Sequence, residues 1–592
     1  MTLKTLLDFA NPQDPGAARL RHAFGPPRQV LVARSASELR PVLDAVHAAA
    51  EQGAWCLGGL RYEAAPAFDA ALRTHAADGP LAWFAVHDTP LPWPPAAPGA
   101  PTVHWDGLPR RARFDAALAT IQAAIARGDC YQVNYTAALC GTLAGGGEQA
   151  AAALFAALQR AQPGGYAACL DLGGEAVLSV SPELFFDWQS GATGAAGEIL
   201  TRPMKGTAPR GAGPEEDAAQ AARLRASPKE RAENVMVVDL LRNDLSRIAE
   251  PHSVQVPRLF HTEALPAVWQ MTSDVRARTR AGTRLWDVFA ALFPCGSVTG
   301  APKAAAMAAI QALEPGPRGL YCGALGVVRP GAQGGVHATF NVPIRTLVLA
   351  GTQLRCGIGS GITAGSQAEA EWQEWQHKAA FLERASAPFE LLETLALEDG
   401  SFRHADRHLA RMGVAAGHFG FPWNAHAVRQ ELQITALQHL QGNWRVRLLL
   451  AADGAAHAEA FALQPTPTPV RLRLAARPLA EAQGEFVRHK TTRRAHYEAL
   501  APQDAGVFDT VLYNPAGEIT ECTRGNVAML LDGRWVTPPL ACGLLPGVGR
   551  ALALEAGRVQ EAVVRLEDAP RVQAWAFVNS LRGWLDAFLA AP

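Results

Sequence analysis

The run KERAENVMVVDLLRNDL, from Lys229 to Leu245, has the pattern of one long helix. Val235, Val238, Leu241 and Leu245 recur near the 3.6-residue period of a helix. Working outward, we expect a helix-rich block over residues 113–160, strand-like segments such as AVLSV at 176–180, and a further helix over residues 366–383. Helical and extended segments therefore alternate along the first 380 or so residues.

Two pairs of glutamates occupy the predicted helices. Glu230 and Glu233 are three residues apart, and Glu371 and Glu374 repeat that spacing, with Lys378 one turn further on. Residues at this spacing project from one face of a helix. One such pair is usually a solvated surface, but two pairs on two helices offer enough oxygen ligands for Mg²⁺. The sequence thus predicts a magnesium site that holds a carboxylate substrate by bridging.

Glycine-rich segments accompany these helices without matching a nucleotide-binding motif. The segment GIGSGI at 357–362 lacks the third glycine of GxGxxG, because Ile362 stands there. The segment FPCGSVTGAPK at 293–303 has the wrong spacing for a phosphate-binding P-loop. Backbone N–H groups in such segments can still bind an anion.

The short stretch RASAP at 384–388 is the predicted domain boundary, because a proline disfavours helix at the residue before it. We expect one domain over residues 1–383 and a second over residues 389–592. No internal repeat of 20–50 residues is present, so the chain has the organisation of a fusion and not of a duplication.

Composition excludes several classes of function. Of 592 residues, 49% are apolar and 18% are charged, which permits large cores. The net charge of −1 argues against nucleic acid or an anionic membrane as a partner. Nine dispersed cysteines indicate reduced thiols. Without a signal-type apolar core or an apolar run of about 20 residues, we expect a soluble, cytoplasmic protein.

The first half resembles the chorismate-utilising enzymes, a family that includes anthranilate, isochorismate, salicylate and aminodeoxychorismate synthases. The resemblance spans roughly residues 50–383 and rests on motifs in the family's order. These motifs are SPELF (181–185), Lys229–Leu245, FPCGSVTGAPK (293–303), RGLYCG (318–323) and the run Gly357–Lys378. The resemblance implies an α+β fold: a large anthranilate-synthase-like β-sandwich domain flanked by helices.

The resemblance also implies roles for individual residues. Glu233 and Glu374 match the Mg²⁺ ligands, with Glu230 and Glu371 as their companions. Glu183 matches the general acid that assists departure of the ring hydroxyl of chorismate. The positions that match substrate-carboxylate contacts are Thr299, Tyr321, Arg345, Gly359, Gly361 and Lys378.

Lys205 distinguishes among the members of this family. TRPMKGT at 201–207 resembles the Pro-Ile-Lys-Gly-Thr signature of aminodeoxychorismate synthases, whereas anthranilate synthases carry alanine in place of Lys205. A lysine nucleophile would divide the replacement of the C4 hydroxyl by an amino group into two easier displacements. Gln270 supports the same subtype, since anthranilate synthases have histidine there, and isochorismate-type enzymes place a lysine base where Gln132 falls.

The chain lacks an obvious glutaminase motif. GAWCLGG at 53–59 only partly imitates the G-x-C-x-G-x-Q elbow, because Leu60 occupies its last position. We therefore expect ammonia from a separate glutamine amidotransferase subunit.

The second half resembles the fold-type IV pyridoxal-phosphate enzymes, over about residues 389–588. In this resemblance Lys490 carries the cofactor and shuttles protons, and Glu521 keeps the pyridine nitrogen protonated. Arg411, Ser580 and the N–H groups of Val548 and Gly549 match the phosphate contacts. Arg493 departs from the asparagine common in lyases of this family. Many members are dimers, so a homodimer through this domain is expected.

Together the two halves predict a bifunctional enzyme of the folate pathway. The first would convert chorismate to 4-amino-4-deoxychorismate, and the second would eliminate pyruvate to give 4-aminobenzoate. The alternatives are an aminotransferase or an inactive docking scaffold as the second half, and anthranilate synthase as the first.

Overall fold

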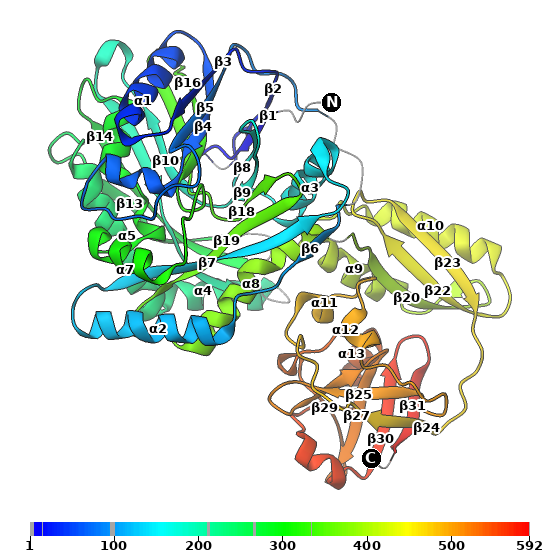
Figure 1. The fold of residues 1–592 in the computed structure, drawn as a ribbon. Helices are drawn as coiled ribbons and strands as arrows, with labels where there is room; N and C mark the ends of the chain where they lie inside the picture. Colours follow the sequence, from blue (N-terminus) through cyan, green and yellow to red (C-terminus); the bar gives the residue numbers. More distant parts are fainter. Residues whose placement is uncertain are drawn as a thin grey trace. The chain divides into compact units, whose positions relative to one another are not determined.

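The computed structural model describes residues 5–14, 16–94, 101–209, 214–264, 268–332, 334–386 and 388–590. Backbone contacts divide the chain into two compact units, Met1–Pro388 and Phe389–Pro592 (Figure 1). Each unit has its own sheets and its own hydrophobic core. In the part of the chain so described, no helix has the length and apolar character needed to cross a membrane.

The first unit contains two antiparallel sheets. In spatial order the first sheet consists of β15 (Gly300–Ala301), β7 (Gln132–Leu143), β19 (Gln353–Ile362), β18 (Thr346–Ala350), β9 (Ala176–Ser181), β8 (Tyr166–Asp171), β1 (Thr5–Phe9) and β2 (Leu20–Phe24), with β6 (Val103–Trp105) beside β7. The second consists of β12 (Met204–Pro209), β14 (Val268–Thr279), β11 (Gly197–Arg202), β10 (Leu184–Gln189), β17 (Val336–Asn341), β16 (Ala324–Pro330), β4 (Trp55–Leu60), β5 (Ala82–His87) and β3 (Gln29–Ala33), with β13 (Gln255–Ala264) beside β14.

The two sheets share a core, as the faces of a sandwich do. Leu7 and Tyr166 from the first sheet are buried in one cluster with Leu57, Leu200 and Leu325 from the second. The fold-class prediction of a β-sandwich flanked by helices is therefore confirmed.

Helices cover the outer faces of both sheets. The core of the second sheet includes apolar residues of α1 (Ala36–Glu51), α5 (Pro228–Ser246) and α6 (Leu285–Leu292). The core of the first sheet includes those of α2 (Arg111–Ala126), α3 (Gly147–Ala161), α7 (Lys303–Leu313) and α8 (Ala368–Ser386). The remaining long helix, α4 (Pro214–Ala226), contacts β12, β13 and β14.

The predicted helices around the glutamate pairs are present. Helix α5 begins after Ser227, whose hydroxyl accepts a hydrogen bond from the Glu230 N–H as an N-cap. The expected helix-rich block over 113–160 is only partly correct, because β7 separates α2 from α3. Tyr135 and Thr136 belong to residue types that favour strands, and pairing with β19 overrides the helical tendency of the flanking alanines.

The second unit contains a small and a large sheet. The small one, in the order β21 (Ser401–Phe402), β20 (Leu391–Glu398), β22 (Asn443–Leu450) and β23 (Ala456–Ala462), packs against α9 (Ala405–Phe419) and α10 (Ala425–Gln438). The large one has the order β26 (Ile519–Cys522), β25 (Asp509–Tyr513), β24 (Val470–Leu474), β31 (Gly583–Leu589), β30 (Ala574–Asn579), β27 (Asn526–Leu531), β28 (Arg534–Thr537) and β29 (Gln560–Glu561). Its short helices are α11 (Glu485–Arg488), α12 (Ala495–Glu498) and α13 (Val548–Glu555).

Candidate active sites

Lys205, on β12, lies among carboxylates that come from distant parts of the sequence. Burial raises the pKa of Glu183, Glu230 and Glu233, and the charge of Lys205 opposes that rise in all three. A side chain added at Gly361 would place its Cβ 3.2 Å from Lys205 Nζ. Tertiary structure thus brings the predicted nucleophile next to the predicted general acid and the glycine-rich strand.

Glu183 is a buried carboxyl group. Its side chain is buried, and among the described residues Oε1 has no hydrogen-bond partner. Burial raises the pKa of Glu183, while a hydrogen bond with Ser297 and the charge of Lys205 oppose the rise. A raised pKa favours the protonated form, which is the form that a general acid needs.

The four predicted magnesium ligands face one another from α5 and α8. Glu374 raises the pKa of Glu230, and Glu371 contributes to the raised pKa of both Glu230 and Glu233, in each case after the larger effect of burial. Glu371 accepts a hydrogen bond of 2.7 Å from Ser366 Oγ, and its Oε2 is buried with no hydrogen-bond partner in the described structure. Such an unpaired buried oxygen is what a cation would satisfy.

The carboxylates do not form a complete metal cage. Within the described ranges, no group of three or more histidine, cysteine, aspartate or glutamate side chains is placed to hold a metal ion. Glu374 instead pairs with Lys378 at 2.5 Å, and this pairing lowers its pKa although burial opposes the change. Mg²⁺ commonly uses only one or two protein carboxylates, with water and substrate oxygens completing its shell. The residues present therefore fit Mg²⁺ in charge and ligand type.

The glycines of β19 are required by close packing. Gly359 is paired with Thr136 of β7, and Gly361 with Asn134. A Cβ at Gly361 would lie 2.2 Å from Gln132 Nε2, a buried atom with no hydrogen-bond partner among the described residues. Lys378 Nζ donates to the Gly359 carbonyl at 2.9 Å. The predicted contacts Gly359, Gly361 and Lys378 therefore lie together.

Two further predicted substrate contacts, Thr299 and Tyr321, lie near this strand in different ways. The Thr299 carbonyl accepts from the Asn134 N–H of β7, so β7 separates Thr299 from β19. Thr299 Oγ1 donates to the Cys295 carbonyl at 3.2 Å, so a substrate carboxylate would compete for that hydroxyl. The ring of Tyr321 packs directly against Gly357, where an added Cβ would lie 2.3 Å from it.

Arg345 is engaged differently from the other predicted substrate contacts. Its guanidinium donates to Gln162 Oε1. Burial, followed by the nearby charge of Arg384, lowers the pKa of Arg345 to about 10. Binding a carboxylate here would require Arg345 to share its donors with Gln162.

Gln270 has structural partners beside Lys205, the predicted nucleophile. Its Nε2 donates to the Gly206 carbonyl at 2.8 Å, and its Oε1 accepts from Thr207 Oγ1 at 3.1 Å. Gln270, which the sequence used to distinguish aminodeoxychorismate from anthranilate synthases, thus binds Gly206 and Thr207, the two residues that follow Lys205.

In the second unit, Lys490 is a buried amine surrounded by charges. Burial, followed by the charges of Arg494 and Arg411, lowers the pKa of Lys490 to about 7, although Glu393 and Glu521 oppose the shift. The Lys490 carbonyl accepts a hydrogen bond of 3.0 Å from the Leu392 N–H. A lysine with this pKa is partly neutral at pH 7 and can react as a nucleophile.

Glu521, the predicted partner of the pyridine nitrogen, is a buried carboxyl group with hydrogen bonds to both oxygens. Its Oε1 accepts from the Tyr497 hydroxyl at 2.6 Å, and its Oε2 accepts from the Leu545 N–H at 3.1 Å. Burial raises its pKa to about 8, and the hydrogen bond from Tyr497 opposes that rise. The carboxyl is therefore held in one orientation.

Arg411 is a residue of α9, and its side chain reaches the N-terminus of α13. Its Nη1 donates to the Pro546 carbonyl at 3.0 Å, and Nε and Nη2 donate to Glu393 at 2.8 and 2.6 Å. Since a guanidinium carries five N–H groups, two remain for a phosphate. Burial opposes the change, but Arg411 and His408 lower the pKa of Glu393 to about 2, so this anchor stays ionised.

The rest of the predicted phosphate site also lies at this helix end. Val548 and Gly549 begin α13, where backbone N–H groups lack helical acceptors. An added Cβ at Gly549 would lie 2.5 Å from the Asn579 carbonyl carbon, so the backbone preceding Ser580 closely approaches the helix. Arg411, Val548, Gly549 and Ser580 would thus fit the phosphate group of pyridoxal phosphate.

Several site residues were not predicted. Glu393, Tyr497 and Ser297 contact predicted residues, yet no role was assigned to them from the sequence. Ser297 lies within the segment FPCGSVTGAPK, and this is the signal by which the sequence could identify it. Glu393 has no such signal, because its partner Arg411 lies 18 residues further along the chain. Tyr497 has no local signal, because its contact with Glu521 spans 24 residues.

Comparison with known proteins agrees with this geometry. The chorismate binding enzyme model matches residues 11–384, and the class IV amino-transferase model matches residues 390–587. Aminodeoxychorismate synthase component 1 of Klebsiella aerogenes is 42% identical over 294 residues, 50% of this chain and 61% of the relative. Anthranilate synthase component 1 of Streptomyces coelicolor is 38% identical over 290 residues, 48% of this chain and 54% of the relative.

A solved structure supports the fold of the first unit. The putative 2,3-dihydroxybenzoate-specific isochorismate synthase of Bacillus anthracis aligns with a TM-score of 0.52 at 21% identity, covering 65% of this chain and 96% of that one. The chain spans about six-tenths of the length of its curated aminodeoxychorismate synthase relatives. Because the matching family model covers more than half of its residues, the chain belongs to the chorismate binding enzymes, and a class IV amino-transferase domain follows in the same polypeptide.

Proposed function

We propose that the chain makes 4-aminobenzoate from chorismate in two steps, one in each unit. The single observation that carries the first step is the position of Lys205, an amine set among Glu183, Glu230 and Glu233 and beside Gly361. The relatives include both aminodeoxychorismate and anthranilate synthases at similar identity, so identity alone does not choose between them. Lys205 and Gln270 favour the former.

In the first step the amine of Lys205 adds at ring C2 of chorismate. The ring double bonds shift, the C4–O bond breaks, and Glu183 supplies the proton with which the hydroxyl leaves as water. Ammonia then adds at C4, the double bonds shift back, and the bond between C2 and the lysine nitrogen breaks. The surplus proton on the new amine returns to Glu183, so the net change is replacement of hydroxyl by amine.

Mg²⁺ would be held by Glu233 and Glu374, with Glu230 and Glu371 supporting them, and would supply a positive charge for a substrate carboxylate. The unpaired Oε2 of Glu371 supports this assignment. The backbone at Gly359 and Gly361 would orient the ring relative to Lys205.

Pyridoxal phosphate, when bound in the second unit, would supply an electron sink for the electron pair left when a proton is removed from the carbon bearing the amine. Arg411 and the start of α13 would hold its phosphate, and Glu521, oriented by Tyr497, would hold its pyridine nitrogen. Lys490 takes the proton from C4 of aminodeoxychorismate. Enolpyruvate then leaves from C3 as the ring becomes aromatic, and the products are 4-aminobenzoate and pyruvate.

The nitrogen source is proposed to be ammonia from a separate glutamine amidotransferase. The printed names of the relatives, component 1, describe one part of a larger enzyme and support this proposal. A protein that used glutamine alone as efficiently as ammonium would contradict it.

Product analysis tests the whole proposal. Purified protein is incubated with chorismate, ammonium, Mg²⁺ and pyridoxal phosphate, and the products are separated by chromatography. We expect 4-aminobenzoate and pyruvate in equal amounts. Formation of anthranilate, or of aminodeoxychorismate without pyruvate, would refute the assignment of the first or the second unit respectively.

A further inference from the structure

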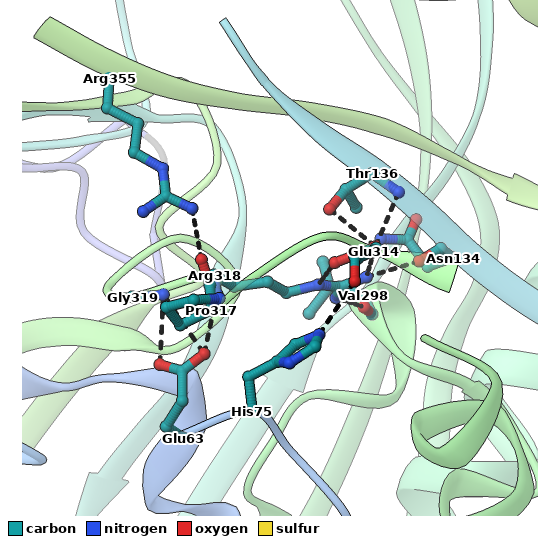
Figure 2. A network of polar contacts seen from close by, with 10 residues as sticks. All are labelled: Glu63, His75, Asn134, Thr136, Val298, Glu314, Pro317, Arg318, Gly319 and Arg355. Carbon is teal, nitrogen blue, oxygen red and sulfur yellow. Dashed lines mark hydrogen bonds and ion pairs between the residues drawn. The ribbon is translucent and has the colours of Figure 1, made fainter. Parts of the chain in front are cut away.

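A buried ion pair lies beside the first candidate site. Glu314 and Arg318 belong to the loop EPGPR between α7 and Tyr321, and their side chains are only 4% and 3% exposed. Figure 2 shows the network around them, in which polar groups from several separate segments converge on this one pair. None of the steps proposed above uses either side chain.

Arg318 uses its guanidinium to join three segments. Nε and Nη2 donate to the two Glu314 oxygens at 2.9 and 2.6 Å. Nη1 donates to the Val298 carbonyl at 2.8 Å, and Nη2 also donates to the Asn134 carbonyl at 2.7 Å (Figure 2). Burial alone would lower its pKa, but Glu314 holds the pKa of Arg318 well above its usual value. The side chain is therefore a permanently charged crosslink.

The carboxylates of Glu314 and Glu63 complete the network. Glu314 Oε1 accepts from both the N–H and the hydroxyl of Thr136, each at 2.9 Å. Glu63 accepts from the backbone N–H groups of Arg318 and Gly319, at 2.8 and 3.1 Å. The backbone that leads to Tyr321 is thus fixed as firmly as the side chain of Arg318.

The segments that Arg318 and Glu314 join through Val298, Asn134 and Thr136 lie next to predicted substrate contacts. Val298 directly precedes Thr299, and the Thr299 carbonyl accepts from the Asn134 N–H at 2.9 Å. Asn134 pairs with Gly361 across β7 and β19, and Thr136 pairs with Gly359 in the same register. Tyr321 follows Arg318 by three residues. One guanidinium therefore connects the backbone at Thr299, Gly359, Gly361 and Tyr321.

We propose that Arg318, held by Glu314, is a positioning residue that sets the spacing of the backbone groups around the chorismate carboxylates. It acts through Val298, Asn134 and Thr136, and it does not touch the substrate. Replacing a buried ion pair by apolar residues is often neutral or stabilising, so stability alone does not account for this pair. The proposal rests on the proposed function of the first unit.

The test compares Arg318→Lys with a matched control. Lysine keeps the charge but lacks the planar fork, so it cannot hold Val298, Asn134 and Glu314 together. We expect the KM for chorismate to rise at least about tenfold, or ~1.4 kcal/mol, with kcat reduced less than about threefold, because uniform binding is lost. The control is Arg329→Lys, which alters a largely buried arginine bonded to His337, away from these segments.

A wild-type protein that forms neither aminodeoxychorismate nor 4-aminobenzoate from chorismate would overturn the proposed function itself. An active wild type whose KM is unchanged in Arg318→Lys, or is raised equally in Arg329→Lys, would overturn the positioning role alone. Should Arg318→Lys not fold, Thr136→Val decides the question, because it removes only the hydroxyl bond to Glu314. We expect its KM to rise about threefold and Thr136→Ser to restore it; an unchanged KM in Thr136→Val refutes the role.

Discussion

Replacing Gly361 by alanine tests the geometry around Lys205. The new Cβ would lie 2.2 Å from Gln132 Nε2, whereas ordinary contact begins at 3.4 Å. Gln132 must therefore move by about 1.2 Å, and Lys205 Nζ, at 3.2 Å, must give way slightly. A misplacement of about 1 Å at a reacting group can cost on the order of 100-fold in rate.

We expect Gly361→Ala to lower kcat for chorismate amination by about 100-fold, or roughly 2.7 kcal/mol in the barrier. The assay follows chorismate consumption at saturating ammonium. Gly365→Ala is the matched control, since no atom lies within 4 Å of its added Cβ and its backbone is not left-handed. Thermal unfolding of the first unit should shift little in either variant. Normal kcat and KM in Gly361→Ala would refute the placement of Lys205 beside this strand.

Three further predictions concern the two lysines and the phosphate site. Lys205→Ala should lower amination with ammonium at least about 1,000-fold, or ~4 kcal/mol; unchanged aminodeoxychorismate synthesis would remove the nucleophile from the mechanism. Gly549→Ala should weaken pyridoxal-phosphate binding at least about tenfold in a fluorescence titration, because the new Cβ would lie 2.5 Å from the Asn579 backbone. The control Gly417→Ala should bind the cofactor normally, because its new Cβ would have no atom within 4 Å. The rate at which cofactor-free protein takes up pyridoxal phosphate, measured by visible absorbance, should increase as the pH rises through about 7. The reason is that only neutral Lys490 reacts, and its pKa is lowered from 10.5. A rate profile with its midpoint above pH 9 would contradict this.

Local sequence pattern predicted those features that depend on neighbours along the chain. The period of Val238 and Leu241 indicated α5, and the spacing of Glu230 and Glu233 placed both on one helix. The resemblance to the fold-type IV enzymes, and not local pattern, singled out Gly549, which lies in the first turn of α13. Local pattern failed for β7, where pairing with β19 decided the conformation of a segment flanked by helices. Motif order then supplied the roles of Lys205 and Lys490 as hypotheses.

The sequence by itself indicated the helices, the two-part organisation and the residues whose side chains can act in catalysis or binding. It could do so because helical periodicity and the presence of a reactive side chain are local properties of the chain. Tertiary structure alone decided which of them meet. The loop EPGPR has the composition of an exposed turn, yet packing against β7 and the 296–300 segment buries Glu314 and Arg318. It also directed Arg345 to Gln162 and surrounded Lys205 with carboxylates from α5. Burial and electrostatic neighbours are set by contacts between residues far apart in the chain, and no local pattern encodes them.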